Sequence, residues 1–134
     1  MSALGAISSL TIQQVEPIYL QANLLTVVDQ SAGISQRVIT DPGFAGDAGT
    51  ILDATAVENY VTYLVPYIPA SSYDVHVGVK DASTRGLWQL AIGRADNFAR
   101  TKSNVGAPQD QYTPGTVYAD VDLGIWKPST TGDK

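Results

Sequence analysis

Few side chains in this sequence could carry out acid–base, nucleophilic or metal chemistry. His76 is the only histidine, and the chain contains no cysteine. Thiolate nucleophiles, disulfides and cysteine-based zinc sites are therefore excluded. A metal site needs several ligands, and a lone histidine on the outward face of an expected strand is more typical of a polar surface residue. The sequence predicts no metal site at His76.

Paired carboxylates would be needed to hydrolyse a glycosidic bond, and they must flank a cleft. Asp120 and Asp122 are two residues apart, so both point to the same face of an expected strand, whereas Asp110 lies in a separate segment. No serine stands in the strand-to-helix turn that a serine hydrolase requires. We expect no catalytic residues, so the chain is not predicted to be an enzyme, although it could be attached to one.

Aromatic side chains beside amides and carboxylates point to a different chemistry, the binding of hydroxyl-rich ligands. Tyr112 follows Asp110 and Gln111, and an aromatic face with polar partners suits a sugar, because desolvated hydroxyls need hydrogen bonds. Trp126 lies near an expected strand end, where its ring could be exposed. The candidate carbohydrate-binding residues are Asn104, Asp110, Gln111, Tyr112 and Trp126. Residues 110–112 could equally anchor a loop to the sheet, and both interpretations remain open.

The elements that would position these residues are indicated by alternating apolar and polar side chains. Such alternation occurs in residues 73–80, 87–92 and 116–124, and a period of two indicates half-buried strands. The turn signal before Leu87 predicts that 73–80 and 87–92 pair as an antiparallel hairpin. In this hairpin Arg85 and Trp88 are expected to be structural. Residues 94–111 are expected to form a long irregular loop.

Further strands are expected before this hairpin, at residues 18–28, 34–40, 50–54 and 56–65, with Tyr60 in a structural role and Pro66 ending the last one. About seven short strands, turn signals between them and no clear helix predict an all-β fold, a two-sheet antiparallel β-sandwich. Residues 1–16 suit an N-terminal extension or linker, although 9–15 alternate briefly. The expected domain is 17–134.

Composition excludes several classes of partner. The chain has 134 residues, which suits one domain, and a net charge of −5 with only 16% charged residues. There is no run of basic residues, so nucleic-acid binding is not expected. The apolar stretches are too short for a membrane-spanning helix. The first residues lack the positive charge of a signal peptide, so secretion is not indicated by a leader.

Several motifs together resemble jelly-roll carbohydrate-binding modules, the galactose-binding-like β-sandwiches attached to bacterial polysaccharide-degrading enzymes. The matching segments, in the order of the family pattern, are 57–63, 69–75, 85–90, 104–112 and 122–124. The resemblance spans residues 18–134. It implies a jelly-roll sandwich, secreted or extracellular, that tethers an enzyme or a surface to a polysaccharide or oligosaccharide without catalysis.

Two departures from the family pattern modify these expectations. Many relatives open with Glu-Ala-Glu, whose carboxylates help to hold a structural calcium ion. Here Gln21 and Asn23 put neutral amides in both places, so we expect weak or no calcium binding, no other metal and no cofactor.

The second departure lies at the other end of the resemblance. Relatives continue beyond the Asp-Leu-Gly strand, so the sandwich is expected to lack its last one or two strands. That predicts an open sheet edge, completed by a complementary C-terminal fragment or a partner chain, or used in self-association. A structural or assembly role is therefore the alternative to carbohydrate binding.

Overall fold

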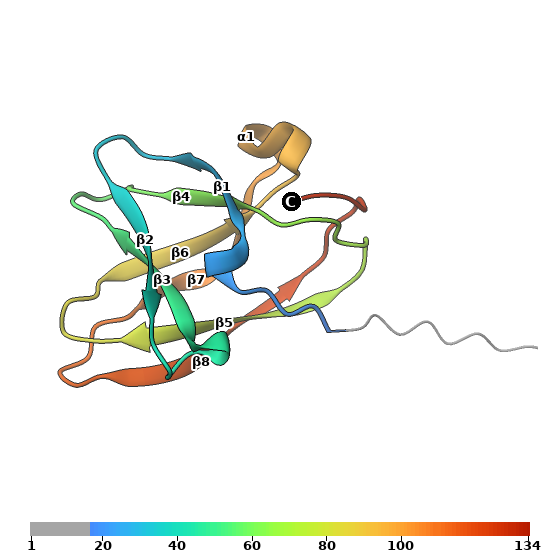
Figure 1. The fold of residues 1–134 in the computed structure, drawn as a ribbon. Coiled ribbons are helices and arrows are strands. Elements are labelled where there is room, and N and C mark those ends of the chain that lie inside the picture. The colour runs from blue at the N-terminus through green and yellow to red at the C-terminus, as the bar shows by residue number, and fades with distance from the viewer. Residues whose placement is uncertain (1–16) are drawn as a thin grey trace, which may run out of the picture.

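The computed structural model describes residues 17–134, so the expected extension 1–16 and the brief alternation at 9–15 lie outside the described residues. The described part forms eight strands (Figure 1). They are β1 (Thr26–Gln30), β2 (Ser35–Thr40), β3 (Ala48–Asp53), β4 (Val61–Leu64), β5 (Tyr73–Asp81), β6 (Leu87–Ile92), β7 (Ser103–Asp110) and β8 (Val117–Trp126). The helical elements are η2 (Ala22–Leu24), η3 (Ala45–Asp47), η4 (Ala95–Asn97) and α1 (Phe98–Thr101).

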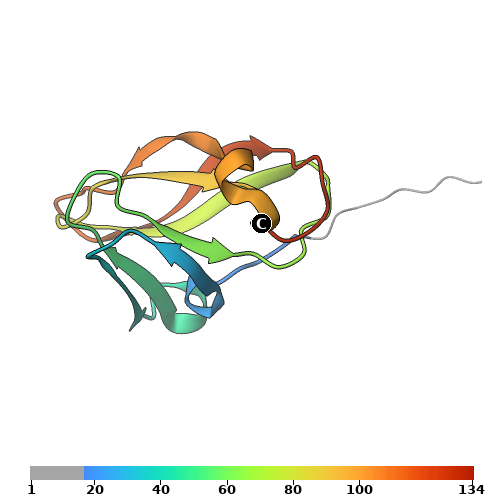
Figure 2. The ribbon, with the colours of Figure 1, turned by 90° about the horizontal axis from the view of Figure 1, so that it is seen from above.

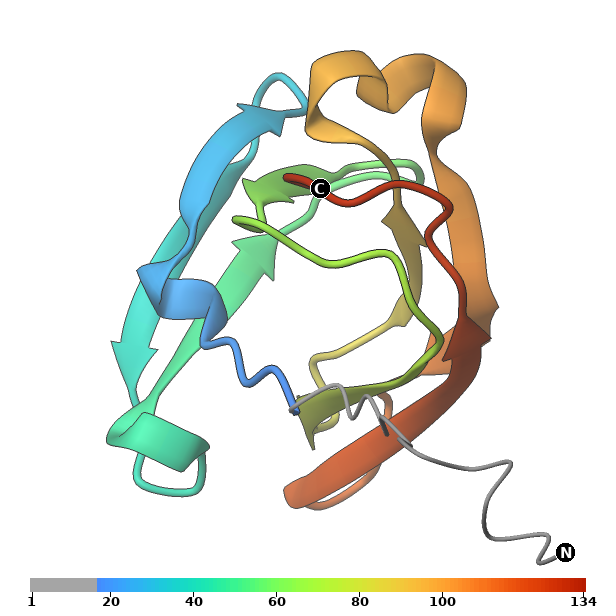
Figure 3. The same ribbon diagram turned by 90° about the vertical axis from the view of Figure 1, so that its right-hand side faces the viewer.

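The strands form four antiparallel pairs: β1 with β4, β2 with β3, β5 with β8, and β6 with β7. The strands β1, β2 and β3 lie on one side of the molecule, and β7 and β8 lie on the opposite side (Figure 3). A view from above shows the same two layers, with α1 facing the viewer (Figure 2). The all-β antiparallel sandwich predicted from the sequence is therefore confirmed.

The core sits where the alternating strands turn their apolar faces inward. Val79 of β5, Val105 of β7 and Leu123 of β8 are buried, as is Ile68 in the segment after β4. Along β5 the exposure alternates as the sequence predicts, with His76 outward and its neighbours at least half-buried. The core is small: every side chain in residues 17–134 keeps at least 2% of its surface exposed.

The predicted hairpin between residues 73–80 and 87–92 is wrong in its pairing, although both strands exist. β5 pairs with β8, from Tyr73 opposite Trp126 to Asp81 opposite Val117. β6 instead pairs with β7, which lies within the segment expected to be an irregular loop. Residues 82–86 therefore connect two strand pairs and do not close a hairpin.

The strand β7 was missed because a bulge interrupts its alternation. Trp88 of β6 faces Gln109, but Leu90 faces Val105. Between these two pairs β7 therefore contains more residues than β6, which is a β-bulge. One of them is Gly106, whose backbone is left-handed (φ 71°). A Cβ at Gly106 would lie 2.8 Å from the carbonyl oxygen of Leu123, so only glycine allows β7 to approach β8 this closely.

Two expected strands are shorter than the sequence indicated. The segment 18–28 contains η2 and becomes a strand only at Thr26. The segment 56–65 is a strand only from Val61, because Asn59 holds the preceding turn: its Oδ1 accepts hydrogen bonds of 2.8 Å from the backbone N–H groups of Thr55 and Ala56. Among residues 17–134, no helix is long and apolar enough to cross a membrane.

The residues after β8 return along the segment that follows β4. Backbone hydrogen bonds of 2.7 and 2.9 Å join Val65 with Lys134, and bonds of 2.9 and 3.0 Å join Ile68 with Gly132. Lys134 thereby lies close to β4 (Figure 1). Completion of the sandwich by another chain, and self-association, remain predictions.

Candidate functional site

The segment 110–112, which was expected to contact sugar, lies at one end of the sandwich beside the connection 82–86. The backbone of Gln111 makes hydrogen bonds to both ends of this connection. Its N–H donates to the Gly86 carbonyl at 3.1 Å, and its carbonyl accepts from the Ala82 N–H at 3.0 Å. Its side-chain amide also donates to the Lys80 carbonyl at 3.4 Å. Gln111 therefore anchors the segment to the end of β5.

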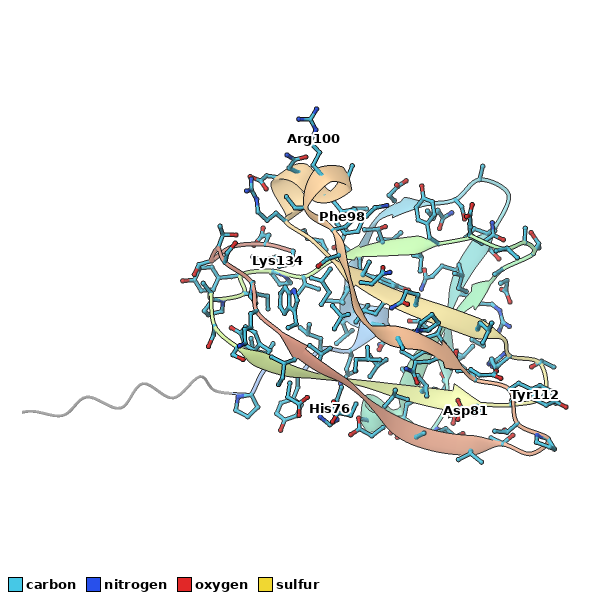
Figure 4. The ribbon with its side chains drawn as sticks, turned by 180° about the vertical axis from the view of Figure 1, so that it is seen from behind. His76, Asp81, Phe98, Arg100, Tyr112 and Lys134 are labelled. Carbon is cyan, nitrogen blue, oxygen red and sulfur yellow. The ribbon has the colours of Figure 1, made fainter. Side chains whose placement is uncertain are left out.

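Tyr112 differs from Gln111 because its side chain points to solvent. It is 54% exposed and lies at the end of the molecule beyond Asp81 (Figure 4). The Asp110 Oδ1 atom accepts a hydrogen bond of 2.9 Å from the Tyr112 N–H, which holds the backbone in a tight turn. This segment therefore presents an exposed aromatic ring on an anchored backbone, next to a carboxylate and an amide.

The remaining two candidate carbohydrate-binding residues lie elsewhere. Asn104 is in β7, opposite Ala91, and is not in a loop as expected. Trp126 lies opposite Tyr73 at the start of β5, with ring centroids 5.8 Å apart. The length of β5 separates Trp126 from Tyr112 by roughly 30 Å, at about 3.3 Å per residue. The structure thus brings together only 110–112.

The three residues expected to be structural differ in the contacts that they make. Tyr60 donates from its hydroxyl to Asp29 Oδ2 at 3.0 Å, and this bond raises the pKa of Tyr60. Trp88 lies on β6, with its indole N–H buried and without a partner among the described residues. Arg85 donates to the Thr84 hydroxyl at 3.3 Å.

The two amides at the family's calcium position lie on either side of the start of η2. Gln21 packs against η3, since a Cβ on Gly46 of that element would lie 2.5 Å from the Gln21 side-chain amide. Asn23 is in η2 itself. Neither side chain carries a negative charge, which is the reason to expect weak or absent calcium binding. That expectation stays a prediction.

A second polar group, which we call the His76 cluster, lies on the outward face of β5 and β8 and consists of Asp74, His76, Asp120 and Asp122. Nδ1 of His76 lies 2.9 Å from Asp120 Oδ2, and Nε2 lies 3.1 Å from Asp74 Oδ2. Asp122 Oδ1 is 3.9 Å from the same Nε2. The His76 side chain is 41% exposed, so solvent reaches the cluster.

A bulge in β8 places Asp122 in the cluster. Val75 faces Gly124, but the next residue, His76, faces Asp122, so Leu123 has no partner on β5. Gly124 has a left-handed backbone (φ 86°), which suits a bulge residue. Its N–H donates to Asp122 Oδ1 at 2.8 Å, and this bond holds the carboxylate in place.

The contacts within the His76 cluster shift the pKa values of its members. Hydrogen bonds to Asp74 and then Asp120 raise the pKa of His76 to about 9, so the imidazole is cationic at neutral pH. The Gly124 N–H, with a smaller contribution from Asp74, lowers the pKa of Asp122. The sequence contained the signal for this cluster, because Asp-x-His and Asp-x-Asp each place their polar residues on one strand face. The incorrect pairing of β5 concealed it.

A third polar group lies on the same face but under a loop. Asp41 accepts from the Lys80 ammonium through Oδ2, and from the Tyr118 hydroxyl (2.7 Å) and the Gly43 N–H (3.0 Å) through Oδ1. These bonds, led by that of Lys80, lower the pKa of Asp41 to about 2. Asp41 is only 7% exposed, so this group is closed to ligands of any size.

A small cleft of about 90 Å³ lies between β1, β4 and α1. The residues that line it are Val28, Thr62, Tyr63, Leu64, Ala95, Phe98 and Lys134. Phe98 and Lys134 lie near each other at this end of the molecule (Figure 4). Most of the lining is apolar, and none of the candidate carbohydrate-binding residues contributes to it.

Comparison with known proteins bears on the fold. No protein-family profile and no curated protein matches the sequence. A solved structure of xanthan lyase from Paenibacillus matches with a TM-score of 0.69, at 20% identity over 84% of this chain. The chain covers only 10% of the length of that protein. This chain therefore shares its β-sandwich fold with one segment of a much larger xanthan lyase.

Proposed function

We propose that this chain is a non-catalytic carbohydrate-binding domain, part of a secreted or extracellular protein, which tethers an enzyme or a surface to polysaccharide. The observation that carries the proposal is the exposed ring of Tyr112 on its anchored backbone. The fold is shared with a segment of a protein named for its polysaccharide substrate, which supports the proposal.

The geometry at residues 110–112 suits a sugar ring for two reasons. The ring of Tyr112 offers an apolar face for the C–H groups of a sugar, and its hydroxyl can bond a sugar hydroxyl. The backbone is already held by Asp110 and by Gln111, so little conformational entropy is lost on binding. In this interpretation anchoring and binding are complementary roles of neighbouring residues.

Electrophoresis in native gels that contain soluble polysaccharides would test this role. The wild-type chain is expected to be retarded by at least one polysaccharide. Tyr112→Ala is expected to weaken that retardation at least about tenfold, because truncating an aromatic anchor at a binding hot spot costs about 2 kcal/mol or more. Tyr19→Ala is the matched control, since Tyr19 is 90% exposed and lies outside the segment.

Two results would contradict the proposal. The first is that no polysaccharide retards a chain whose circular dichroism shows an intact β fold. The second is that Tyr112→Ala binds as the wild type does. If the first result came with concentration-dependent oligomers in light scattering, an assembly role would replace carbohydrate binding.

A further inference from the structure

Two carboxylate oxygens and one imidazole nitrogen converge on a single point of the His76 cluster. Nε2 of His76 lies 3.1 Å from Asp74 Oδ2 and 3.9 Å from Asp122 Oδ1, and the three groups offer ligand atoms within 4.8 Å of one another. When Nδ1–H donates to Asp120, a neutral His76 would turn its Nε2 lone pair toward two negative oxygens. In that tautomer a cation between the three atoms, either a proton on Nε2 or a metal ion, would remove the repulsion.

The spacing of these atoms fits a metal ion. Nitrogen and oxygen ligands lie 2.0–2.2 Å from Zn²⁺, so two ligands of a tetrahedral site are about 3.4 Å apart. The separations of 3.1 and 3.9 Å lie on either side of that value. Small rotations of the carboxylates would bring all three atoms to bonding distance, and the fourth position would face solvent.

Asp120 occupies the place of an orienting carboxylate. Metal-bound histidines commonly donate their second ring N–H to a carboxylate, which fixes the ring and raises the basicity of the ligating nitrogen. Asp120 Oδ2 lies 2.9 Å from Nδ1, on the side of the ring away from Nε2. The Gly124 N–H likewise holds Asp122 Oδ1, and all four side chains stand on paired strands.

The imidazole also indicates which metal would bind. Exposed carboxylates alone attract cations with little selectivity, and Ca²⁺ and Mg²⁺ prefer sites made only of oxygen. A nitrogen from His76 with oxygens from Asp74 and Asp122 favours first-row divalent transition metals.

We propose that Asp74, His76 and Asp122 bind Zn²⁺ or a similar first-row divalent metal ion, with Asp120 orienting the imidazole. The site is separate from the proposed sugar contact at Tyr112 and does not depend on it. A bound ion would cross-link β5 and β8 and would stabilise the folded chain, since only the folded state assembles the ligands.

Calorimetric titration of the chelator-treated full chain with ZnCl₂ would test the site, with nuclear magnetic resonance of the imidazole followed in parallel. His76 is the only histidine, so its ring signals need no further assignment. We expect binding of one Zn²⁺ per chain, a shift of the imidazole signals and a higher melting temperature. CaCl₂ and MgCl₂ are expected to bind at least about tenfold more weakly.

Variants distinguish a built site from non-specific attraction. His76→Gln and Asp122→Asn are expected to lower the Zn²⁺ affinity at least about tenfold, and Asp120→Asn about 10- to 100-fold if it acts through His76. Glu58→Gln removes an exposed carboxylate elsewhere and is the matched control. Gly78→Ala adds a methyl group into open space between the two polar groups of this face and should bind normally.

The proposal is overturned if the wild-type chain binds no Zn²⁺. It is also overturned if His76→Gln binds as tightly as the wild type, or if Ca²⁺ binds as tightly as Zn²⁺ without moving the imidazole signals. Either of the last two results would assign the affinity to the carboxylates alone and leave His76 as an ion-paired surface residue. Circular dichroism of each variant confirms that lost affinity is not lost folding.

Discussion

Lys80 and His76 stand on the same face of β5, opposite residues of β8, yet their surroundings differ. The loop after β2 brings Asp41 and Gly43 over Lys80 and Tyr118, and the Asp41 side chain is only 9% exposed. Within residues 17–134 no such loop covers His76, whose partners Asp120 and Asp122 have side chains 70% and 59% exposed. The two groups use the same chemistry, a cation held by carboxylates.

The difference shows that burial under a loop, and not the ion pair itself, determines whether such a polar group is structural or accessible to ligands. A covered ion pair has few waters to compete with it and cannot exchange its partners, so it holds a loop onto the sheet. An uncovered group is screened by water and salt, so it adds less to folding but stays accessible to ions. The first group is accordingly structural, and the second is a candidate for binding.

Asp41→Asn is expected to have the largest effect on stability. The amide cannot replace the charge that Lys80 faces, and a half-buried ammonium would lose its partner. We expect the melting temperature to fall by roughly 5–10 °C. Asp47→Asn is the control, an exposed acid of the same loop. Equal effects of the two substitutions would refute a special role for the covered ion pair.

Gly43→Ala and Gly78→Ala compare the covered and the open parts of this face directly. A Cβ on Gly43 would lie 2.1 Å from the Tyr118 ring, whereas a Cβ on Gly78 meets nothing within 4 Å. Displacing the Tyr118 ring should cost about 1–3 kcal/mol, and Gly78→Ala should stay within about 0.5 kcal/mol of wild type. Urea unfolding measures both. A cost at Gly78 similar to that at Gly43 would show that the face is not open there.

The two groups should also titrate at opposite ends of the pH range. The pKa of Asp41 is lowered from 3.8 to about 2, so its contribution is present above pH 3.8 and is lost as the pH falls through 2. The pKa of His76 is raised from 6.5 to about 9, so its contribution is present below pH 6.5 and is lost as the pH rises through 9.

Unfolding curves across this range, measured with a chelator present, would separate the two contributions. His76→Gln should remove only the loss of unfolding free energy at alkaline pH, and Asp41→Asn should remove only the loss at acid pH. High salt should weaken the His76 contribution more, because it is the more exposed. Alkaline loss of stability that persists in His76→Gln would have to come from other groups.

Tyr112→Ala should have the smallest effect on folding, because the bonds of this segment come from its backbone and from Gln111. We expect a change within about 0.5 kcal/mol in urea unfolding, while the binding of polysaccharide is weakened at least about tenfold. A larger loss of stability would mean that the ring anchors the loop, the alternative left open by the sequence.

Much of the architecture follows from local pattern. Alternation in residues 73–80 and 116–124 correctly predicted two strands and the face on which His76, Asp120 and Asp122 lie. Short strands separated by turns predicted the all-β sandwich. The motif at 110–112 singled out Tyr112 as a sugar contact, which stays a prediction, and the structure places its ring 54% exposed. These features depend on side chains near in sequence, so the residues alone are sufficient.

The partner of each strand was decided only by the tertiary structure. The bulge at Gly106 hid β7, so β6 lost its true partner and β5 was paired with β6 instead of β8. That one error kept His76 apart from Asp120 and Asp122. Asp41 likewise meets Tyr118 across 77 positions of sequence. Local periodicity determines which way a side chain points, whereas the packing of distant segments determines what it meets and whether it is covered.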